Sequence, residues 1–217
     1  MAKNLSLATY KAKGSAGLLT FSNWLGISYF KQKATSVGNP KTSGQVNQRA
    51  RLSKMVEVFR GIATIILIGF REKKVKMSAY NAFVKANIMS ALTYVSEGVF
   101  TLDWVSLKVS AGTLGDTPVL TSSASGAGNN LTLTYSNTVD TYGQALTDLA
   151  MVFYYNNDTQ VGGWSTNSGK TRADGTITVT VEGGVTTGDE IYAYLFFAST
   201  TDNKCSNSVQ VTITAGA

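Results

Sequence analysis

Asn130-Leu-Thr-Leu-Thr-Tyr135 alternates polar and apolar residues, and so does Thr176-Ile-Thr-Val-Thr-Val181. Alternation with a period of two is typical of β-strands that have one buried and one solvated face. Five further segments of strand-like composition accompany these two, separated by turns rich in Gly, Asn and Asp. The candidate strands are residues 104–109, 118–122, 130–136, 149–155, 176–182, 190–198 and 208–214. Seven short strands at this spacing predict an all-β, immunoglobulin-like or fibronectin type III-like sandwich.

Upstream of the strands the apolar residues change to helical spacing. Thr42 and Gln45 have the spacing of a capping box, in which each side chain bonds a backbone amide of the other residue. We therefore expect one helix over about residues 43–70, loosened near Gly61, and a second over about 78–94. Helices so close in sequence are expected to pack as an antiparallel pair.

The first 33 residues contain aromatic and β-branched residues interrupted by glycine, which predicts a hairpin or an extended arm. Two helices alone cannot hide both of their apolar stripes, so we expect this arm to cover them, from the same chain or from a neighbour. The predicted assembly interface consists of Leu18, Leu19, Phe21, Trp24, Ile27, Tyr29 and Phe30. The predicted fold class is α+β, with an arm and two-helix assembly domain at 1–100 and an immunoglobulin-like sandwich at 101–217.

The net charge of +6 is divided unequally between these two parts. Residues 1–100 carry 15 Lys and Arg against 3 Asp and Glu, a net +12, whereas residues 101–217 carry 4 against 10, a net −6. Opposite charges attract within a chain or between copies, and a basic surface also suits nucleic acid. The candidate basic face consists of Lys31, Lys33, Arg49, Arg51, Lys54, Arg60, Lys73, Lys74 and Lys76. The alternative interpretation is a set of solvated lysines.

Residues that carry catalysis are scarce. The chain has no histidine, which excludes His-based triads and most zinc sites. Its one cysteine, Cys205, excludes an internal disulfide and is expected to be a small core or edge residue. Ser168-Gly169-Lys170-Thr171 resembles the end of a phosphate-binding loop, but Trp164 stands where that motif needs glycine, so we expect a hairpin loop. We predict no catalytic, cofactor or metal site, and no enzyme.

Two loops remain as candidates for binding. Gly162-Gly163-Trp164 is expected to form a loop whose tryptophan either packs on its own sheet or stacks on a sugar. Asn156-Asn157-Asp158 offers too few oxygens for calcium and is expected to be a turn. The N-terminus has no uninterrupted apolar segment, and the longest apolar run, 62–70, is shorter than the ~20 residues of a membrane span. We expect a protein made in the cytoplasm, without a signal peptide and without a membrane partner.

Several spaced motifs resemble an uncharacterised family of unknown function from Bacteroidota and their bacteriophages, over nearly the whole chain. They are Trp24-x-Gly26-x-x-Tyr29, Thr42-x-x-Gln45-x-x-x-Arg49, Gly69-Phe70, Tyr80-Asn81-x-Phe83 with Asn87, Tyr192-x-Tyr194 and Ser206-Asn207-Ser208. The resemblance carries no established activity and implies a virion-type structural protein.

We therefore expect a non-enzymatic structural subunit of a phage virion, at the capsid surface or in the tail. It would form homo-oligomers through its arm and helices, with copies of itself and other virion proteins as partners. One alternative is a nucleic-acid-associated protein that uses residues 31–76. The other is an adhesion module that binds a glycan or a protein through the sandwich loops.

Overall fold

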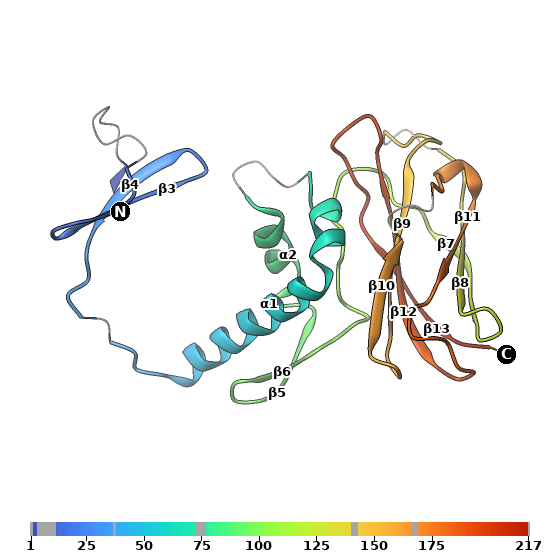
Figure 1. The fold of residues 1–217 in the computed structure, drawn as a ribbon, viewed down its shortest axis with the longest axis horizontal. Helices are drawn as coiled ribbons and strands as arrows, with labels where there is room; N and C mark the ends of the chain where they lie inside the picture. The colour runs from blue at the N-terminus through green and yellow to red at the C-terminus, as the bar shows by residue number, and fades with distance from the viewer. Residues whose placement is uncertain are drawn as a thin grey trace. The chain divides into compact units, whose positions relative to one another are not determined.

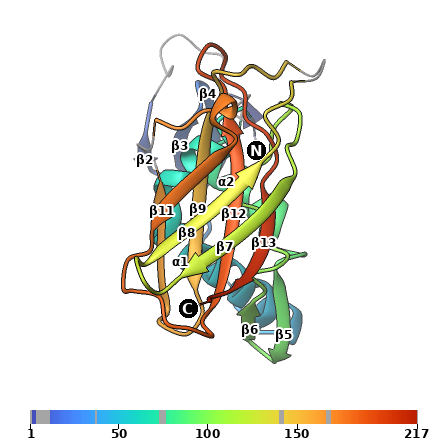
Figure 2. The same cartoon turned by 90° about the vertical axis from the view of Figure 1, so that its right-hand side faces the viewer.

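The computed structural model describes residues 2–3, 12–36, 38–72, 77–139, 143–165 and 169–216. The chain divides into two compact units, Met1–Thr42 and Ser43–Ala217. Figure 1 and Figure 2 show the ribbon from two directions.

The first unit is a four-stranded antiparallel sheet with the strand order β1-β4-β3-β2. Trp24 pairs with Ile27, so β3 and β4 are joined by the two-residue loop Leu25-Gly26. Both loop residues have positive φ, 48° and 80°, as such tight hairpins require. The hairpin predicted from the sequence is confirmed as the centre of this larger sheet. Its strands are β1 (Ala2–Lys3), β2 (Gly14–Ala16), β3 (Leu19–Trp24) and β4 (Ile27–Gln32).

The second unit contains two larger antiparallel sheets, ordered β10-β9-β12-β13 and β11-β8-β7. They pack face to face around buried side chains such as Leu131, Leu133, Ile191 and Leu195. Figure 2 shows the three-stranded sheet in front of the four-stranded one, with the helices behind both. The strands are β7 (Val119–Ser125), β8 (Asn130–Tyr135), β9 (Leu149–Asn156), β10 (Val161–Ser165), β11 (Thr176–Thr180), β12 (Glu190–Ala198) and β13 (Val209–Thr214).

One predicted strand is absent from the described structure, and one predicted loop is a strand. Residues 104–109 form an irregular segment, because the Asp103 carboxylate accepts a hydrogen bond from the Val105 amide (3.0 Å) and starts a turn there. Conversely β10 was predicted as a loop, because its two glycines have low strand propensity. Its pairing with β9 overrides that propensity.

Helix α1 (Ser43–Gly69) has the predicted bounds to within one residue. Its backbone is non-helical at Ile62 (φ −129°, ψ 25°), next to Gly61, so the predicted loosening is confirmed as a kink. Helix α2 (Ala79–Asn87) starts after Ser78, whose hydroxyl accepts a hydrogen bond from the Asn81 amide (3.1 Å).

The predicted extension of the second helix to residue 94 is wrong. The chain there forms a hairpin of β5 (Leu92–Ser96) and β6 (Val99–Leu102). The buried Asn87 donates to the carbonyl oxygens of Phe83 and Lys108 (both 3.0 Å) and accepts from the Lys108 amide (2.8 Å). This side chain ties the end of α2 to a distant loop.

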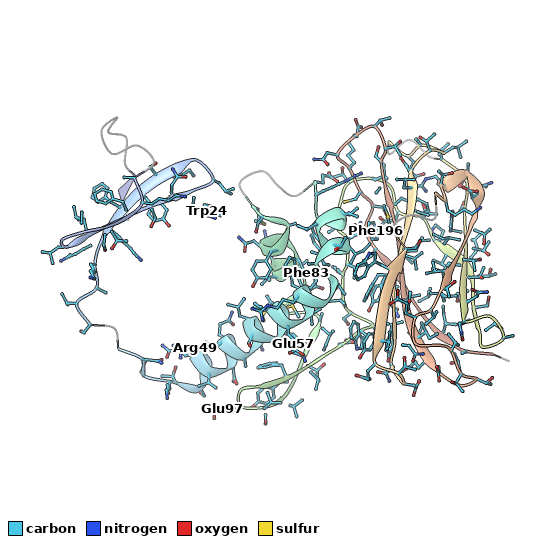
Figure 3. The ribbon with its side chains drawn as sticks, in the orientation of Figure 1. Trp24, Arg49, Glu57, Phe83, Glu97 and Phe196 are labelled. Carbon is cyan, nitrogen blue, oxygen red and sulfur yellow. The ribbon has the colours of Figure 1, made fainter. Side chains whose placement is uncertain are left out.

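The helices cover the outer face of the four-stranded sheet. Val152 on β9 points between the two sheets, whereas its neighbours Met151 and Phe153 belong to the core shared with the helices. Figure 3 shows Phe83 of α2 and Phe196 of β12 in this region between helices and sheet, and both belong to that core. The sheet therefore supplies the cover that the sequence had assigned to the N-terminal arm.

The predicted fold class is wrong in its organisation. It placed an arm and an antiparallel helix pair before a separate all-β immunoglobulin-like sandwich. The described residues instead form four separate antiparallel sheets and two helices, with strand the commoner element. The helices form a third layer on the sheets within one compact unit. Because the helices cover one face of β9 and β12 and the second sheet covers the other, both faces of these strands are buried. Their sequences are therefore continuous apolar runs and do not alternate between polar and apolar residues.

Candidate functional site

The register of the N-terminal sheet divides the predicted assembly residues between its two faces. Directly paired residues share a face, so Leu19, Phe21 and Phe30 lie on one side of the sheet. We call this side, completed by Gly14, Ala16, Asn23, Ser28 and Gln32, the apolar face. The Phe21 and Phe30 rings lie 6.2 Å apart between centroids. Within this unit, the described residues provide no helix and no second sheet to cover it.

The opposite side of the same sheet combines aromatic, hydroxyl and basic side chains. Trp24, Ile27, Tyr29 and Lys31 lie there, and Trp24 is 48 % exposed. We call this side, completed by Ser15, Thr20 and Ser22, the basic aromatic face. Leu18, the remaining predicted interface residue, is exposed in the β2–β3 turn.

The residues of the predicted basic face are divided between the two units. Lys31 and Lys33 are exposed in the first unit, whereas Arg49 and Arg60 are exposed on α1 in the second. Lys73, Lys74 and Lys76 lie outside the described residues.

Two cations of α1 are engaged by their own chain. The Arg51 guanidinium lies 4.9 Å from the centroid of the Phe100 ring and donates to the Met89 sulfur (3.1 Å). Lys54 pairs with Glu57 (3.0 Å). The sequence could not show these partners, because Phe100 and Met89 reach the helix only through tertiary packing.

A cleft of about 480 Å³ opens in the second unit between α1, β6 and the β9–β10 hairpin. Its apolar surface includes Trp104, which is stacked on Tyr155 with 3.8 Å between ring centroids. Its polar surface includes the Lys54–Glu57 pair and Gln160. Clefts of this size with a few polar groups are typical of small-ligand sites. The remaining lining residues are Val58, Gly61, Ile62, Phe100, Thr101, Leu102, Phe153 and Gly162.

Trp164 lies on strand β10 rather than in the predicted loop. It pairs with Phe153, so its side chain lies on the same face of the sheet as the cleft-lining Phe153 and Gly162. It is 38 % exposed. The structure therefore places Trp164 beside the cleft, and it adds Trp104, which the sequence had assigned to a strand. No motif in the sequence marks Trp104.

Two tyrosines of β12, Tyr192 and Tyr194, contact the aromatic cluster that Trp104, Phe153 and Tyr155 form at the cleft. The Tyr194 hydroxyl donates to the Trp104 carbonyl, and burial raises the pKa of Tyr194. The Tyr192 hydroxyl donates to the Glu190 carboxylate (2.6 Å), and this bond, more than burial, raises the pKa of Tyr192 to about 12. Both phenols therefore stay protonated at neutral pH and act as hydrogen-bond donors that position the cluster.

A buried ion pair in the same unit escaped the sequence analysis. Arg172 and Asp148 have side chains that are 0 % and 1 % exposed, with 3.6 Å between guanidinium and carboxylate. The guanidinium also donates to the Thr117 hydroxyl and lies 4.1 Å from the centroid of the Phe197 ring. Arg172 thus connects Asp148, Thr117 and Phe197, which are far apart in the sequence, and its role is to stabilise the fold of the second unit.

The segment that resembles a phosphate loop has a different structure. Lys170 pairs with Asp174 (3.0 Å), and Arg172–Asp174 form a single 3-10 turn before β11. The described part, which excludes Ser168, connects β10 to β11, which belong to different sheets, so the predicted hairpin loop is wrong. The predicted turn at 156–158 is confirmed, because the Asn156 side chain accepts from the Asp158 amide (2.9 Å).

Other chemistry in the described residues is limited. Cys205 is buried, as predicted, and burial raises the pKa of its thiol. Over the described ranges, no three Cys, Asp or Glu side chains gather as a metal site. Within the same ranges, no helix has the length and hydropathy needed to cross a bilayer.

The second unit has a two-sheet body with a helical layer and an aromatic cleft, while the first is a small sheet with one apolar and one basic aromatic face. The sequence matches the profile of a family of unknown function (DUF6266) over residues 11–212. Since this match covers most of the chain, the protein belongs to that family. A search of curated proteins found no match. The resemblance to a family of unknown function is thus confirmed, whereas the bacteriophage origin stays a prediction.

Proposed function

We propose that the chain is a non-enzymatic structural subunit that self-associates through its N-terminal sheet. The observation that supports this is the apolar face, because the described residues of this unit place no second layer over its phenylalanines. A small sheet gains stability when such a face packs against another layer. The proposed occupant is the same face of a second copy.

Charge supports pairing between copies. None of the paired, described residues that define the apolar face is ionisable, and Lys31 lies on the opposite side of the sheet. Two sheets packed face to face, about 10 Å apart, therefore keep these lysines solvated. Such an isologous contact is the commonest arrangement in homo-oligomers.

The proposed setting is a phage virion, at the capsid surface or in the tail. Its support is the motif resemblance described above, which implies a virion-type structural protein. Partners in this setting are copies of the chain and other virion proteins.

Disulfide trapping tests the contact in the full chain. Leu19→Cys places a thiol on the apolar face, and Thr20→Cys places one on the opposite face at the next position. Because Cys205 is buried, we expect mild oxidation to give a covalent dimer with Leu19→Cys and little with Thr20→Cys. Light scattering of the wild-type chain provides the second measurement. A monomer at every concentration and salt, or equal trapping of both variants, contradicts the proposal.

A second candidate function is carbohydrate binding at the cleft, favoured by the exposed Trp164 beside it. The C–H face of a sugar ring suits an aromatic surface, and its hydroxyls suit a rim of Lys54, Glu57 and Gln160. The measurement is calorimetric titration with neutral oligosaccharides. We expect Trp164→Ala to weaken binding, and Trp24→Ala, in the other unit, to leave it unchanged. If no class of oligosaccharide gives a heat of binding, the carbohydrate-binding function is contradicted.

A further inference from the structure

The whole net charge of the protein resides in its smaller unit. Residues 1–42 contain six lysines and no Asp or Glu, a net +6. Residues 43–217 contain 13 Lys and Arg and 13 Asp and Glu, a net charge of zero. A unit of 42 residues without a single acidic side chain offers its lysines no Asp or Glu to pair with, so it is a concentrated source of positive potential.

The strand register places some of this charge beside exposed rings. Tyr29 and Lys31 are two positions apart on β4, so both side chains belong to the basic aromatic face. The Lys33 amide donates to the Leu18 carbonyl (2.7 Å), which continues the ladder by one step and keeps Lys33 on the same side. Trp24, at the far end of this face, is 48 % exposed, and Lys31 and Lys33 are exposed.

Hydroxyl side chains lie on strand β3, next to β4, where Thr20 pairs with Lys31 and Ser22 pairs with Tyr29. Ser15 and Thr20 lie on adjacent strands of this face with 3.2 Å between their oxygens. The face therefore combines flat rings, cations and neutral hydrogen-bonding groups, without an acidic residue that would repel a polyanion.

We propose that the basic aromatic face binds single-stranded nucleic acid. Bases stack on Trp24 and Tyr29, and phosphates pair with Lys31 and Lys33. Stacking on sheet-borne rings with a basic track alongside is the general mode for binding single strands without sequence preference. The sequence predicted nucleic-acid binding by residues 31–76, whereas this proposal assigns the binding to the basic aromatic face alone. It does not depend on the apolar face or on self-association.

An anionic membrane is the less fitting occupant. Insertion into a membrane interface needs exposed apolar side chains gathered on one surface, with basic residues beside them. Here Leu18 lies in the β2–β3 turn and Leu25 in the β3–β4 turn, which are at opposite ends of β3. The hydroxyls of the face also suit a polar ligand better than acyl chains.

The experiment is fluorescence anisotropy of labelled oligothymidylate and oligouridylate with the full-length protein at low and moderate salt. We expect binding of both, weakening steeply as salt rises because phosphate contacts release counterions. Trp24→Ala should weaken binding roughly tenfold, whereas Trp24→Phe, which keeps a ring, should retain most of it. The double variant Lys31→Gln/Lys33→Gln should flatten the salt dependence. Lys85→Gln, an exposed lysine of the second unit, is the matched control.

Several outcomes overturn the proposal. They are no binding at low salt, equal loss with Lys85→Gln, unchanged binding with both Trp24→Ala and the double lysine variant, or preference for vesicles of anionic lipid over either oligonucleotide. Phe21→Ser, on the apolar face, separates the two proposals. It should reduce self-association and leave nucleic-acid binding intact, so either proposal can fail alone.

Discussion

At the scale of single residues, the motifs of the family resemblance are largely explained by packing. Gly69 is the clearest case, because its carbonyl accepts hydrogen bonds from the Ser110 hydroxyl (2.9 Å) and the Cys205 thiol (2.9 Å). A Cβ at Gly69 would lie 2.3 Å from the Val109 carbonyl oxygen. Asn87 likewise closes α2 on the chain near Lys108. These positions hold the helical layer on the sheets and say little about ligands.

Gly69 and Gly61 form a matched pair for a stability test. Gly69→Ala must push the helix end away from Val109, and we expect a loss of about 1–3 kcal/mol in the free energy of unfolding. Gly61→Ala meets nothing within 4 Å and should raise that free energy by about 0.5–1 kcal/mol, because alanine favours helix. Urea denaturation of both variants measures the difference. Equal effects would contradict the close contact at Gly69.

The buried ion pair predicts a larger loss. Asp148→Ala leaves the Arg172 charge buried without its carboxylate, which should cost about 3–5 kcal/mol of unfolding free energy. Asp202→Ala, which removes the exposed partner of Lys204, should leave the unfolding midpoint nearly unchanged. Thermal denaturation compares the two. A small effect of Asp148→Ala would mean that the pair contributes little to stability.

Buried tyrosines predict a loss of stability in alkali. Burial, then the charge of Asp174, raises the pKa of Tyr135 from 10.0 to about 12. The folded state therefore binds this proton more tightly than the unfolded state, and its contribution is complete below pH 10 and disappears as pH rises toward 12. The melting temperature should fall across this interval, and less in Tyr135→Phe. Identical pH profiles would exclude Tyr135 as a source.

At the scale of elements, sequence patterns succeeded where one face of an element decides its structure. The alternation at β8 and β11 and the helical spacing of α1 all predicted the correct element. They failed where tertiary contacts decide, since β10 depends on pairing with β9 and the β5–β6 hairpin follows a helix closed by Asn87. The cleft was hidden for the same reason, because Trp104 meets Tyr155 only in the folded chain.

The helical layer predicts which fragments fold. Residues 101–217, the predicted sandwich domain, would expose side chains that now lie under the helices, including Phe153, Tyr194 and Phe196. We expect this fragment to aggregate, because exposed apolar surface of this kind drives association. Residues 43–217, which keep both helices, should remain soluble. The recovery of each fragment by size-exclusion chromatography checks the prediction. A soluble, cooperatively unfolding 101–217 fragment would show that the sheets do not need the helices.

At the scale of the whole molecule, the two units differ in their interior cores and in their net charge. The second unit has two interior cores, one between its sheets and one beneath its helices, and zero net charge. The first has a thin sheet, the entire net charge and half-buried rings. A unit with its own cores folds independently, whereas a single sheet depends on what packs against it. Folding and association should therefore be separable.

Deletion of residues 1–42 tests that separation. We expect the shortened chain to keep the cooperative unfolding transition of the full protein and to lose both self-association and oligonucleotide binding. The physical reason is that both surfaces reside in the deleted sheet, while both cores lie outside it. Calorimetry, light scattering and anisotropy on the same preparation give the three measurements. If the shortened chain still assembles, contacts of the second unit hold the copies together, and the apolar face is not the interface.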